Sequence, residues 1–182
     1  MHYNPHHRQG QMDHLQSYFY TDTIAGHKHL LANDDLKMII IESWKYLIAR
    51  RKIKIYAFVI MPNHIHLLWQ MLEMNGKETP AGSFAKFTAH EFKKSLLKSN
   101  PTELASYKVF ERDRLYRFWK RDPLAITMST EQIFLQKLNY IHSNPVHSKW
   151  NLAEVPEKYH WSSAKFYEHG INEFGIVSDY RE

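Results

Sequence analysis

The stretch 53–71, IKIYAFVIMPNHIHLLWQM, constrains the fold of this chain more than any other. It contains two apolar runs, 55–60 and 65–69, both rich in β-branched and aromatic residues, with Met61-Pro62-Asn63 between them. Pro62 has no backbone donor and disfavours a helical conformation at the residue before it. The stretch therefore predicts a strand, a tight connection and a second strand.

Two histidines, His64 and His66, stand at the start of the second predicted strand. Because strand side chains alternate, both imidazoles share one face while Ile65 and Leu67 point to the other. Two neutral imidazoles on a rigid strand face can serve as a pair of metal ligands. Among 13 histidines such a pair is also compatible with two surface side chains. The apolar setting favours the metal site, because burying unpartnered imidazoles is costly.

The composition is that of one globular domain over residues 1–182, with 43% apolar residues and no cysteine. The absence of cysteine excludes disulfides and thiolate metal sites and fits a reducing compartment. No apolar run approaches the roughly 18 residues of a membrane span, and the first residues lack the apolar core of a signal segment. We therefore expect a cytoplasmic protein without a membrane partner.

The net charge of +5, with 5 Trp, 11 Tyr and 10 Phe, suggests a polyanionic partner with bases that can stack, such as nucleic acid. One segment, 111–122 (ERDRLYRFWKRD), interleaves basic and aromatic residues. It is compatible with a nucleic-acid contact or with a half-buried connection. Its candidate DNA contacts are Arg112, Arg114, Arg117, Trp119, Lys120 and Arg121. The lysines along 83–100 favour a solvated helix face.

The remaining patterns predict a strand over 15–21, a helix over 36–51 after an Asn33 cap, a helix from a Ser83 cap to Asn100, a short strand within 107–110, and a helix from a Ser129 cap to Asn144. Residues 1–14 are expected to form a loose arm and 146–182 a packed C-terminal extension. This order predicts an α+β fold, a ferredoxin-like βαββαβ sandwich with an antiparallel sheet. Its helices would cover one face and leave the other open for the histidines.

The last predicted helix carries a polar stripe, Gln136, Tyr140 and Asn144, with four-residue spacing. An Asn oxygen can complete a site with two imidazoles, and such a mixed site with open positions suits Mg²⁺ or Mn²⁺ bound to a phosphate oxygen. The Tyr140 phenol could then attack phosphorus while the metal offsets the developing charge.

Three segments together resemble a known family. They are 56–68 (YAFVIMPNHIHLL), 118–121 (FWKR) and 138–146 (LNYIHSNPV), with Trp161-Ser162-Ser163-Ala164 as a fourth, shorter match. In this order they resemble the HUH signature and later motifs of small single-tyrosine insertion-sequence transposases, and more particularly of the REP-associated tyrosine transposases. The resemblance covers well over half of the chain.

The resemblance implies an HUH nuclease fold acting on single-stranded DNA, often at hairpin ends, with the tyrosine on a C-terminal helix. It implies His64, His66 and Asn144 as ligands of a divalent metal and Tyr140 as the nucleophile. The implied reaction is a transesterification that leaves a 5′-phosphotyrosine and a free 3′ hydroxyl, and its reversal rejoins DNA. A homodimer is one candidate assembly of such proteins.

Two alternatives accompany this hypothesis of a metal-dependent DNA transposase and endonuclease. One is a catalytically inactive module that binds DNA or RNA hairpins. The other is a hydrolase in which His64 and His66 activate water. The three differ in the role of Tyr140, which is needed for cleavage only in the first.

Overall fold

The computed structural model describes residues 12–111 and 114–181. The strands and α-helices, in chain order, are β1 (Ser17–Thr23), α1 (Asp34–Ala49), β2 (Ile53–Met61), β3 (His64–Met71), α2 (Pro80–Ser99), α3 (Pro101–Ala105), β4 (Leu124–Thr127), α4 (Glu131–Ser143) and α5 (Ala164–His169). Short 3-10 turns occur at Ala25–His27, Leu30–Ala32, Asn144–Val146 and Pro156–Lys158.

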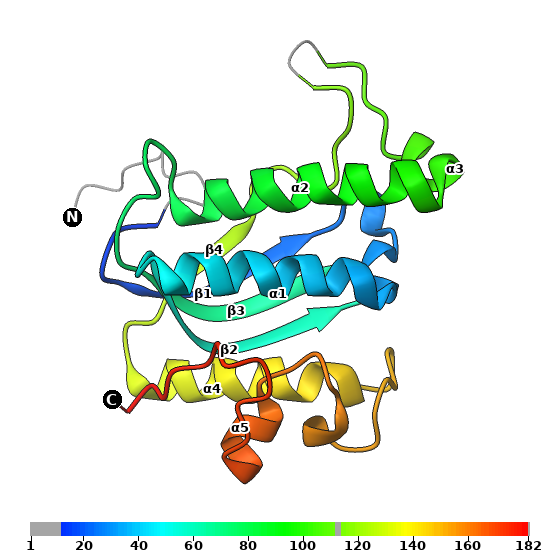
Figure 1. The fold of residues 1–182 in the computed structure, drawn as a ribbon. Helices are drawn as coiled ribbons and strands as arrows, with labels where there is room; N and C mark the ends of the chain where they lie inside the picture. Colours follow the sequence, from blue (N-terminus) through cyan, green and yellow to red (C-terminus); the bar gives the residue numbers. More distant parts are fainter. Residues whose placement is uncertain (1–11, 112–113, 182) are drawn as a thin grey trace, which may run out of the picture.

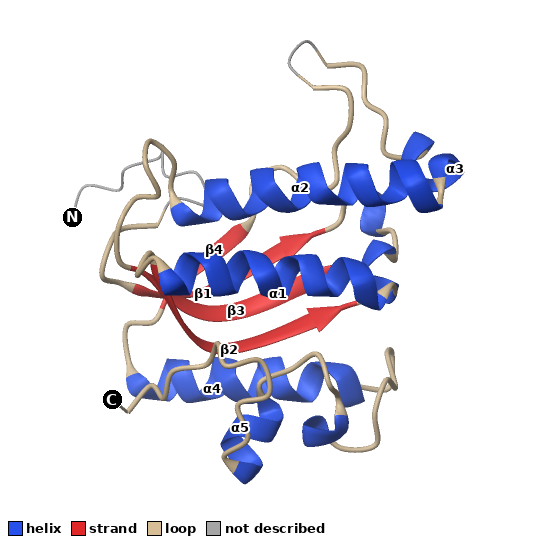
Figure 2. Cartoon of the chain, in the orientation of Figure 1, coloured by secondary structure: helices blue, strands red, loops and turns tan. Residues whose placement is uncertain are grey.

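The four strands form one antiparallel sheet in the order β2-β3-β1-β4 (Figures 1 and 2). This order, with helices after β1 and β3, is the predicted ferredoxin-like βαββαβ arrangement, so the fold class is confirmed. Helices α1 and α2 lie side by side over one face, and α4 lies on the other face (Figure 1).

The connection at Pro62 sets the register of the central hairpin. Met61 pairs with His64 across the turn, and His66 lies opposite Val59 of β2 and Thr21 of β1. Both histidines therefore occupy the face that α4 covers, as strand alternation predicts. Ile65, Leu67 and Trp69 point to the α1 and α2 layer, and all three are fully buried there.

The second face is covered, whereas the sequence predicted an open one. Helix α4 packs across β2 and β3, and His66 is only 5% exposed. Phe134, Leu138 and Ile141 form the predicted apolar stripe of α4 and are buried against the sheet. An amphipathic helix buries its apolar stripe wherever an apolar surface is free, so the expectation of an open face was wrong.

The fourth strand is β4 at Leu124–Thr127, and its predicted position within 107–110 was wrong. Residues 107–110 instead pair locally with the chain that follows them: Val109 N–H donates to the Leu115 carbonyl and Arg117 N–H to the Tyr107 carbonyl. The β4 sequence, LAIT, is short and mostly exposed on the edge of the sheet. Such a strand carries little hydrophobic alternation for sequence reasoning to detect.

Several boundaries also differ by a few residues. Helix α2 is capped by Thr79, with Pro80 in its first turn, and not by Ser83. The hydroxyl of Thr130 accepts from Ile133 N–H at the start of α4, so the cap is Thr130 and not Ser129. Asn33 caps α1 as predicted. Serine and threonine are both favoured as N-cap residues, so the backbone path decides which of two neighbours caps the helix.

The C-terminal segment closes the free edge of β2. Ile60 N–H donates to the Trp161 carbonyl, Ser163 N–H donates to the Phe58 carbonyl, and Phe58 N–H donates to Ser163 Oγ. Further along, Ser178 N–H donates to the Ile55 carbonyl. An exposed strand edge invites pairing with another chain, and these bonds occupy much of it.

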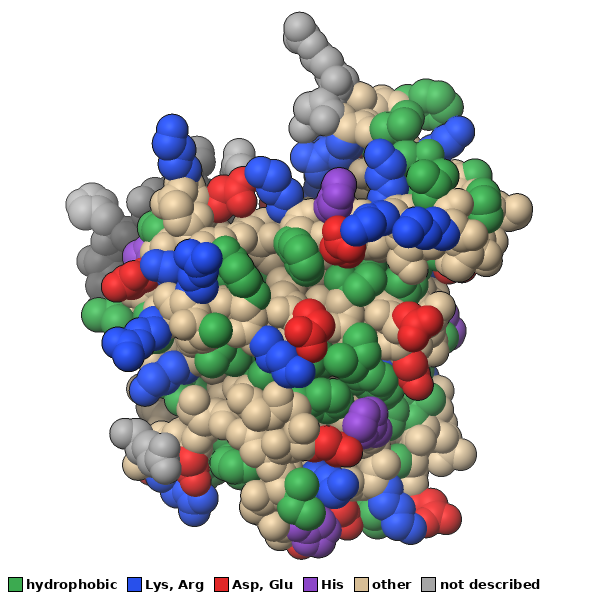
Figure 3. All heavy atoms as spheres, viewed as in Figure 1, with side chains coloured by type: hydrophobic (Ala, Val, Ile, Leu, Met, Phe, Trp, Pro, Cys, Tyr) green, Lys and Arg blue, Asp and Glu red, His purple; other side chains and the backbone are tan. Residues whose placement is uncertain are grey.

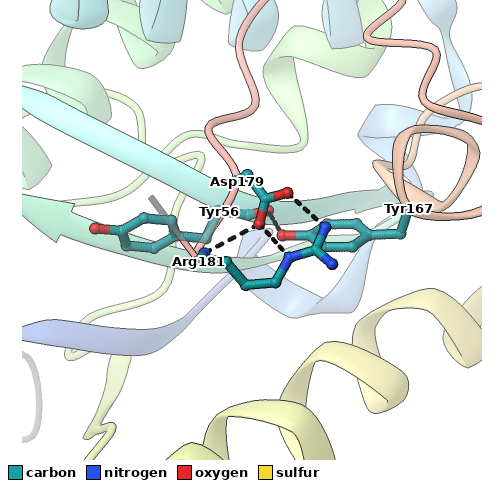
Figure 4. Close-up of polar contacts among 4 residues, drawn as sticks. All are labelled: Tyr56, Tyr167, Asp179 and Arg181. Carbon is teal, nitrogen blue, oxygen red and sulfur yellow. Dashed lines mark hydrogen bonds and ion pairs between the residues drawn. The ribbon is translucent and has the colours of Figure 1, made fainter.

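Figure 4 shows the end of this segment beside β2. The Tyr167 hydroxyl donates to the Tyr56 carbonyl at 2.8 Å, and Arg181 forms a two-pronged ion pair with Asp179, at 2.8 and 2.6 Å. The Tyr167 bond fixes α5 to the edge strand. The Arg181 side chain of this ion pair is 69% exposed, so the pair is screened by solvent and contributes little to stability.

The expected loose arm, 1–14, falls mostly outside the described residues, since these begin at Met12. Met12 itself is 9% exposed and packs with the core. Within residues 12–111 and 114–181, no helix combines the length and the apolar character needed to cross a bilayer.

Asp22 of β1 generates a testable prediction about stability. It is 2% exposed on the α2 side of the sheet, where Tyr20 Oη donates to its carboxyl at 3.0 Å and Thr23 N–H at 2.9 Å. Burial raises the pKa of Asp22 to about 7. The folded protein thus keeps a proton that the unfolded chain releases near pH 4. The contribution of protonated Asp22 to the free energy of unfolding is complete below pH 4 and is lost as the pH rises through about 7.

We expect the difference in unfolding free energy between wild type and Asp22→Asn to shift by about 4 kcal/mol between pH 4 and pH 8, with wild type relatively less stable at pH 8. Urea denaturation at the two pH values measures it, with Asp35→Asn as the variant that removes one exposed carboxyl. A pH-independent difference for Asp22→Asn would contradict the prediction.

Candidate functional site

His66 is buried with one ring nitrogen bonded and the other without a partner. Its Nδ1 lies 2.7 Å from the hydroxyl oxygen of Thr21, which faces it across the β1–β3 pair. Its Nε2 is buried and has no hydrogen-bond partner among the described residues. If Nδ1 carries the proton and donates to Thr21, Nε2 presents a lone pair. A partnerless buried nitrogen is costly unless it serves as a ligand.

His64 is oriented by a similar bond from the turn that precedes it. Its Nδ1 lies 2.6 Å from Asn63 Oδ1, and Asn63 Nδ2 donates to the His27 carbonyl at 3.1 Å. Because the amide nitrogen is used by His27, the amide oxygen is the acceptor for His64 Nδ1–H. The lone pair of His64 is then on Nε2, as proposed for His66.

Both imidazoles are held neutral. Burial, followed by the charges of Lys149 and His27, lowers the pKa of His64 to about 4. Burial lowers the pKa of His66 well below its usual range, with His64 and Lys137 adding to the effect. A neutral imidazole is the form that binds a metal ion.

Tyr140 lies directly over this pair. Its ring centroid is 5.2 Å from that of His66 and 5.8 Å from that of Phe19, both in edge-to-face geometry. The Tyr140 side chain is 49% exposed, and it projects from α4 on a different side from the buried apolar stripe of that helix. Lys137, one turn earlier on α4, places its ammonium 5.7 Å from the Tyr140 ring centroid. The Tyr140 phenol ring therefore stands between solvent and His66.

A cleft of about 410 Å³ brings these groups together. Its walls come from the end of β1, the Pro62 turn, and the end of α4 with the loop after it, and include Thr23, His27, Asn63, His64, Tyr140, Ser143, Asn144, His147, Lys149 and Trp150. Asn144 is half-buried at the C-cap of α4, where its backbone is still helical. The structure thus places Tyr140, His64 and Asn144 around one cleft, with His66 beneath the Tyr140 ring.

The donor set suits a divalent cation. His64 and His66 each have an Nε2 that their Nδ1 partner leaves available, and Asn144, whose side chain carries an amide oxygen, lines the same cleft. The described residues contain no cluster of three or more His, Cys, Asp or Glu side chains arranged for a metal. A metal held here would therefore take two imidazoles and a neutral oxygen ligand. The bonds from Thr21 and Asn63 are of the outer-shell kind that orients histidine ligands.

The predicted nucleic-acid residues divide between surface and interior. Lys120 and Arg121 are exposed, and Arg114, Arg117 and Arg121 are all ion-paired with Glu111. Arg112 lies outside the described residues. Lys120 comes nearest to the Tyr140 cleft: its ammonium is 3.5 Å from Nε2 of His27, and its backbone N–H donates to the Thr23 carbonyl.

Trp119 is buried, with 7% exposure. Its indole nitrogen donates to the Thr88 hydroxyl of α2 at 2.9 Å, and its ring packs on Phe84 and Phe92. A base could stack on this ring only if it left the core. Trp119 therefore packs in the core, as expected if the segment 111–122 is a half-buried connection.

A second cleft, of about 710 Å³, lies between α2 and this segment and is lined by Lys86, Arg114, Arg117, Lys120 and Arg121. The predicted lysines of α2, Lys86, Lys93, Lys94 and Lys98, are exposed, as expected of a solvated face. Figure 3 shows Lys and Arg side chains along α2, with single acidic side chains between them. This face is basic but carries its own counter-charges.

Sequence reasoning missed Thr21, Asn63 and Trp150. Thr21 becomes a partner of His66 only through pairing of strands 45 residues apart. Asn63 directly precedes His64, so its short side chain in a turn was a local signal. Lys149-Trp150 is a basic–aromatic pair of the kind sought in 111–122 and could have been found in the same way.

Comparison with known proteins agrees on the fold. The chain has the architecture of a tyrosine transposase. It is similar to a solved REP-associated tyrosine transposase bound to a REP hairpin, with 14% identity, a TM-score of 0.61, and coverage of 93% of this chain and 90% of that one. A second solved structure, a proposed transposase from Deinococcus radiodurans, shows 18% identity and a TM-score of 0.43 over 72% of this chain and 92% of its own. No family model and no curated protein matches the chain.

The His66–Thr21 bond can be tested by a substitution that keeps side-chain shape. Thr21→Val leaves His66 Nδ1 buried without a partner, so we expect a loss of about 1–3 kcal/mol in unfolding free energy. Thr23→Val is the matched control, because Thr23 is on the same strand face and its side chain has no hydrogen bond within the described residues. Equal stabilities of the two variants, measured by urea denaturation, would show that the bond contributes nothing.

Proposed function

We propose that this protein is a metal-dependent endonuclease of the transposase type that cleaves and rejoins single-stranded DNA, with Tyr140 as the nucleophile. The observation that carries the proposal is the exposed Tyr140 phenol over a buried, neutral histidine, in a cleft that also holds His64 and Asn144. The fold shared with a transposase structure that contains a DNA hairpin supports DNA as the substrate.

His64, His66 and Asn144 would hold Mg²⁺ or Mn²⁺. When bound, such an ion offsets negative charge on the non-bridging phosphate oxygens. The buried Nε2 of His66 supports this role, since no other described group uses it in a hydrogen bond.

In the reaction, the Tyr140 oxygen forms a bond to the scissile phosphorus and the bond from phosphorus to the 3′ oxygen breaks. The phenol loses its proton and the departing 3′ oxygen gains one, so charge balances. One phosphodiester replaces another, and the reverse attack by a 3′ hydroxyl rejoins DNA without an energy source. Lys137 and Lys149, on either side of Tyr140 in sequence, supply positive charge near the phosphate.

The contact between the Tyr140 ring and His66 supports this function over the water-activating hydrolase, because it puts a candidate nucleophile beside the proposed metal ligands. The two oriented imidazoles, His66 buried and His64 at the cleft wall, also support catalysis over the inactive binding module, since hairpin binding alone does not need them. The candidate homodimer stays a prediction, as does the identity of the metal.

The reaction can be tested with a hairpin-bearing single-stranded DNA in Mn²⁺ or Mg²⁺. A label at the 3′ end of the DNA should move to protein size, because Tyr140 keeps the 5′ phosphate of the downstream piece. A 5′ label should appear on a free, shortened strand. Tyr140→Phe should give neither product, whereas Tyr46→Phe, which alters a similarly exposed tyrosine on α1, should behave as wild type.

The outcomes separate the three hypotheses. Cleavage without a protein-bound label, surviving in Tyr140→Phe, would establish the hydrolase instead. Binding of the hairpin without cleavage in either metal would establish the inactive module. A protein-bound 5′ label would show the opposite polarity of attack.

Metal binding can be measured apart from activity. Electron paramagnetic resonance can measure Mn²⁺ binding to the protein. We expect His66→Ala to abolish this binding. We expect Thr21→Val to weaken it about 10- to 100-fold, because a histidine that is not oriented by a hydrogen bond is a poorer ligand. Thr127→Val, on the edge strand β4 and outside this cleft, serves as the control. Mn²⁺ affinity unchanged by His66→Ala would contradict the assigned ligand set.

A further inference from the structure

Trp150 differs from the four other tryptophans of the chain. Trp44 and Trp69 are completely buried, and Trp119 and Trp161 are each 7% exposed. Trp150 is only half-buried and lines the Tyr140 cleft. Trp150 packs on the core with only part of its ring, so the rest of the indole surface is open to the cleft.

The loop that presents Trp150 is held by its own hydrogen bonds. Trp150 N–H and Asn151 N–H both donate to the His147 carbonyl, at 2.8 and 2.9 Å, and Leu152 N–H donates to the Pro145 carbonyl at 2.8 Å. Asn151 takes a left-handed conformation, with φ of 46°, that closes this turn. The turn directly follows Asn144 and the end of α4. The indole is therefore fixed relative to the proposed catalytic groups.

The surroundings of the indole leave it suited to stacking. Its ring lies 5.7 Å from that of His64 and 5.8 Å from that of His29, with planes inclined by 48° and 47°, so neither histidine stacks flat on it. The exposed Lys149 places its ammonium 5.4 Å from the ring centroid. Because this ammonium lies over the ring, a stacking base would take its place while Lys149 contacts the phosphate, which is how aromatic and basic side chains combine on single-stranded nucleic acid.

We propose that Trp150 is the stacking platform for an unpaired base next to the scissile phosphate, with Lys149 contacting the phosphate of the same nucleotide. This inference rests on the proposed function, since it takes single-stranded DNA as the ligand. Because Trp150 contacts His64, a base held there keeps its phosphate within about one nucleotide of the histidine pair. A base that stays paired and stacked in a duplex cannot reach the indole, so this platform selects an unpaired strand at the cleavage position.

The test is a binding titration in EDTA, where no cleavage can occur. A short thymidine oligonucleotide should quench the intrinsic tryptophan fluorescence of the wild-type protein and protect it from acrylamide. The other four tryptophans are buried and provide a constant background. Trp150→Phe should lose the quenching but keep most of the affinity, measured by anisotropy of a labelled oligonucleotide.

Trp150→Leu should bind the oligonucleotide about 5- to 150-fold more weakly, the range that corresponds to one base–aromatic stack. Lys149→Gln should reduce the slope of log affinity against log salt by about 1. Tyr46→Leu, which removes an exposed aromatic from the distant α1 surface, is the matched control and should bind as wild type. A duplex of the same length should compete poorly.

Undiminished affinity in a folded Trp150→Leu protein would overturn the proposal. If that variant fails to fold, the wild-type titration still decides: saturable binding without quenching or acrylamide protection would place the bases elsewhere. This failure is distinct from failure of the proposed reaction. Stacking on Trp150 without any covalent adduct would leave a binding site in a protein that does not cleave, and an adduct without stacking would leave the reaction intact.

Discussion

The pairing of β1 with β3 is the constraint on which the site depends. It sets Thr21 opposite His66, so that the Thr21 hydroxyl is the hydrogen-bond partner of His66 Nδ1. The buried Nε2 of His66 has no hydrogen-bond partner among the described residues. A slip of one residue would turn His64 and His66 toward the α1 and α2 layer and expose Ile65 and Leu67 to α4. The apolar core on one face therefore holds the register that the chemistry on the other face needs.

Helix α4 packs on the sheet with an apolar stripe and presents Tyr140 from a second, polar stripe. Phe134, Leu138 and Ile141 bury the helix against the sheet, and Tyr140 stands on the flank with half of its surface in solvent. Because the apolar stripe fixes the rotation of the helix, it also fixes the direction of the phenol. The turn after the helix then carries Asn144 and Trp150 to the same cleft, so one element and its cap supply most of the proposed catalytic surface.

Much of this could be predicted from local pattern. The β-branched runs on either side of Pro62, the alternation of His64 and His66, and the polar spacing of Tyr140 and Asn144 are properties of single elements, and all of them are found where strand and helix periodicity place them. The short edge strand β4 could not be predicted, because its pairing with β1 depends on partners about a hundred residues away. Trp119 was equally ambiguous, since an aromatic residue in a basic segment has the same sequence signature on the surface and in the core.

The sequence by itself determined the first three strands with helices α1, α2 and α4, and the shared face of the two histidines, because these follow from hydrophobic period within single segments. Residue chemistry and a family resemblance together offered Tyr140 as the candidate nucleophile. Only the tertiary structure decided that α4 covers the histidine face, that Thr21 and Asn63 orient the imidazoles, and that Trp150 lies in the cleft while Trp119 lies in the core. These contacts join residues far apart in the chain. They arise from the packing of whole elements, which no local pattern encodes.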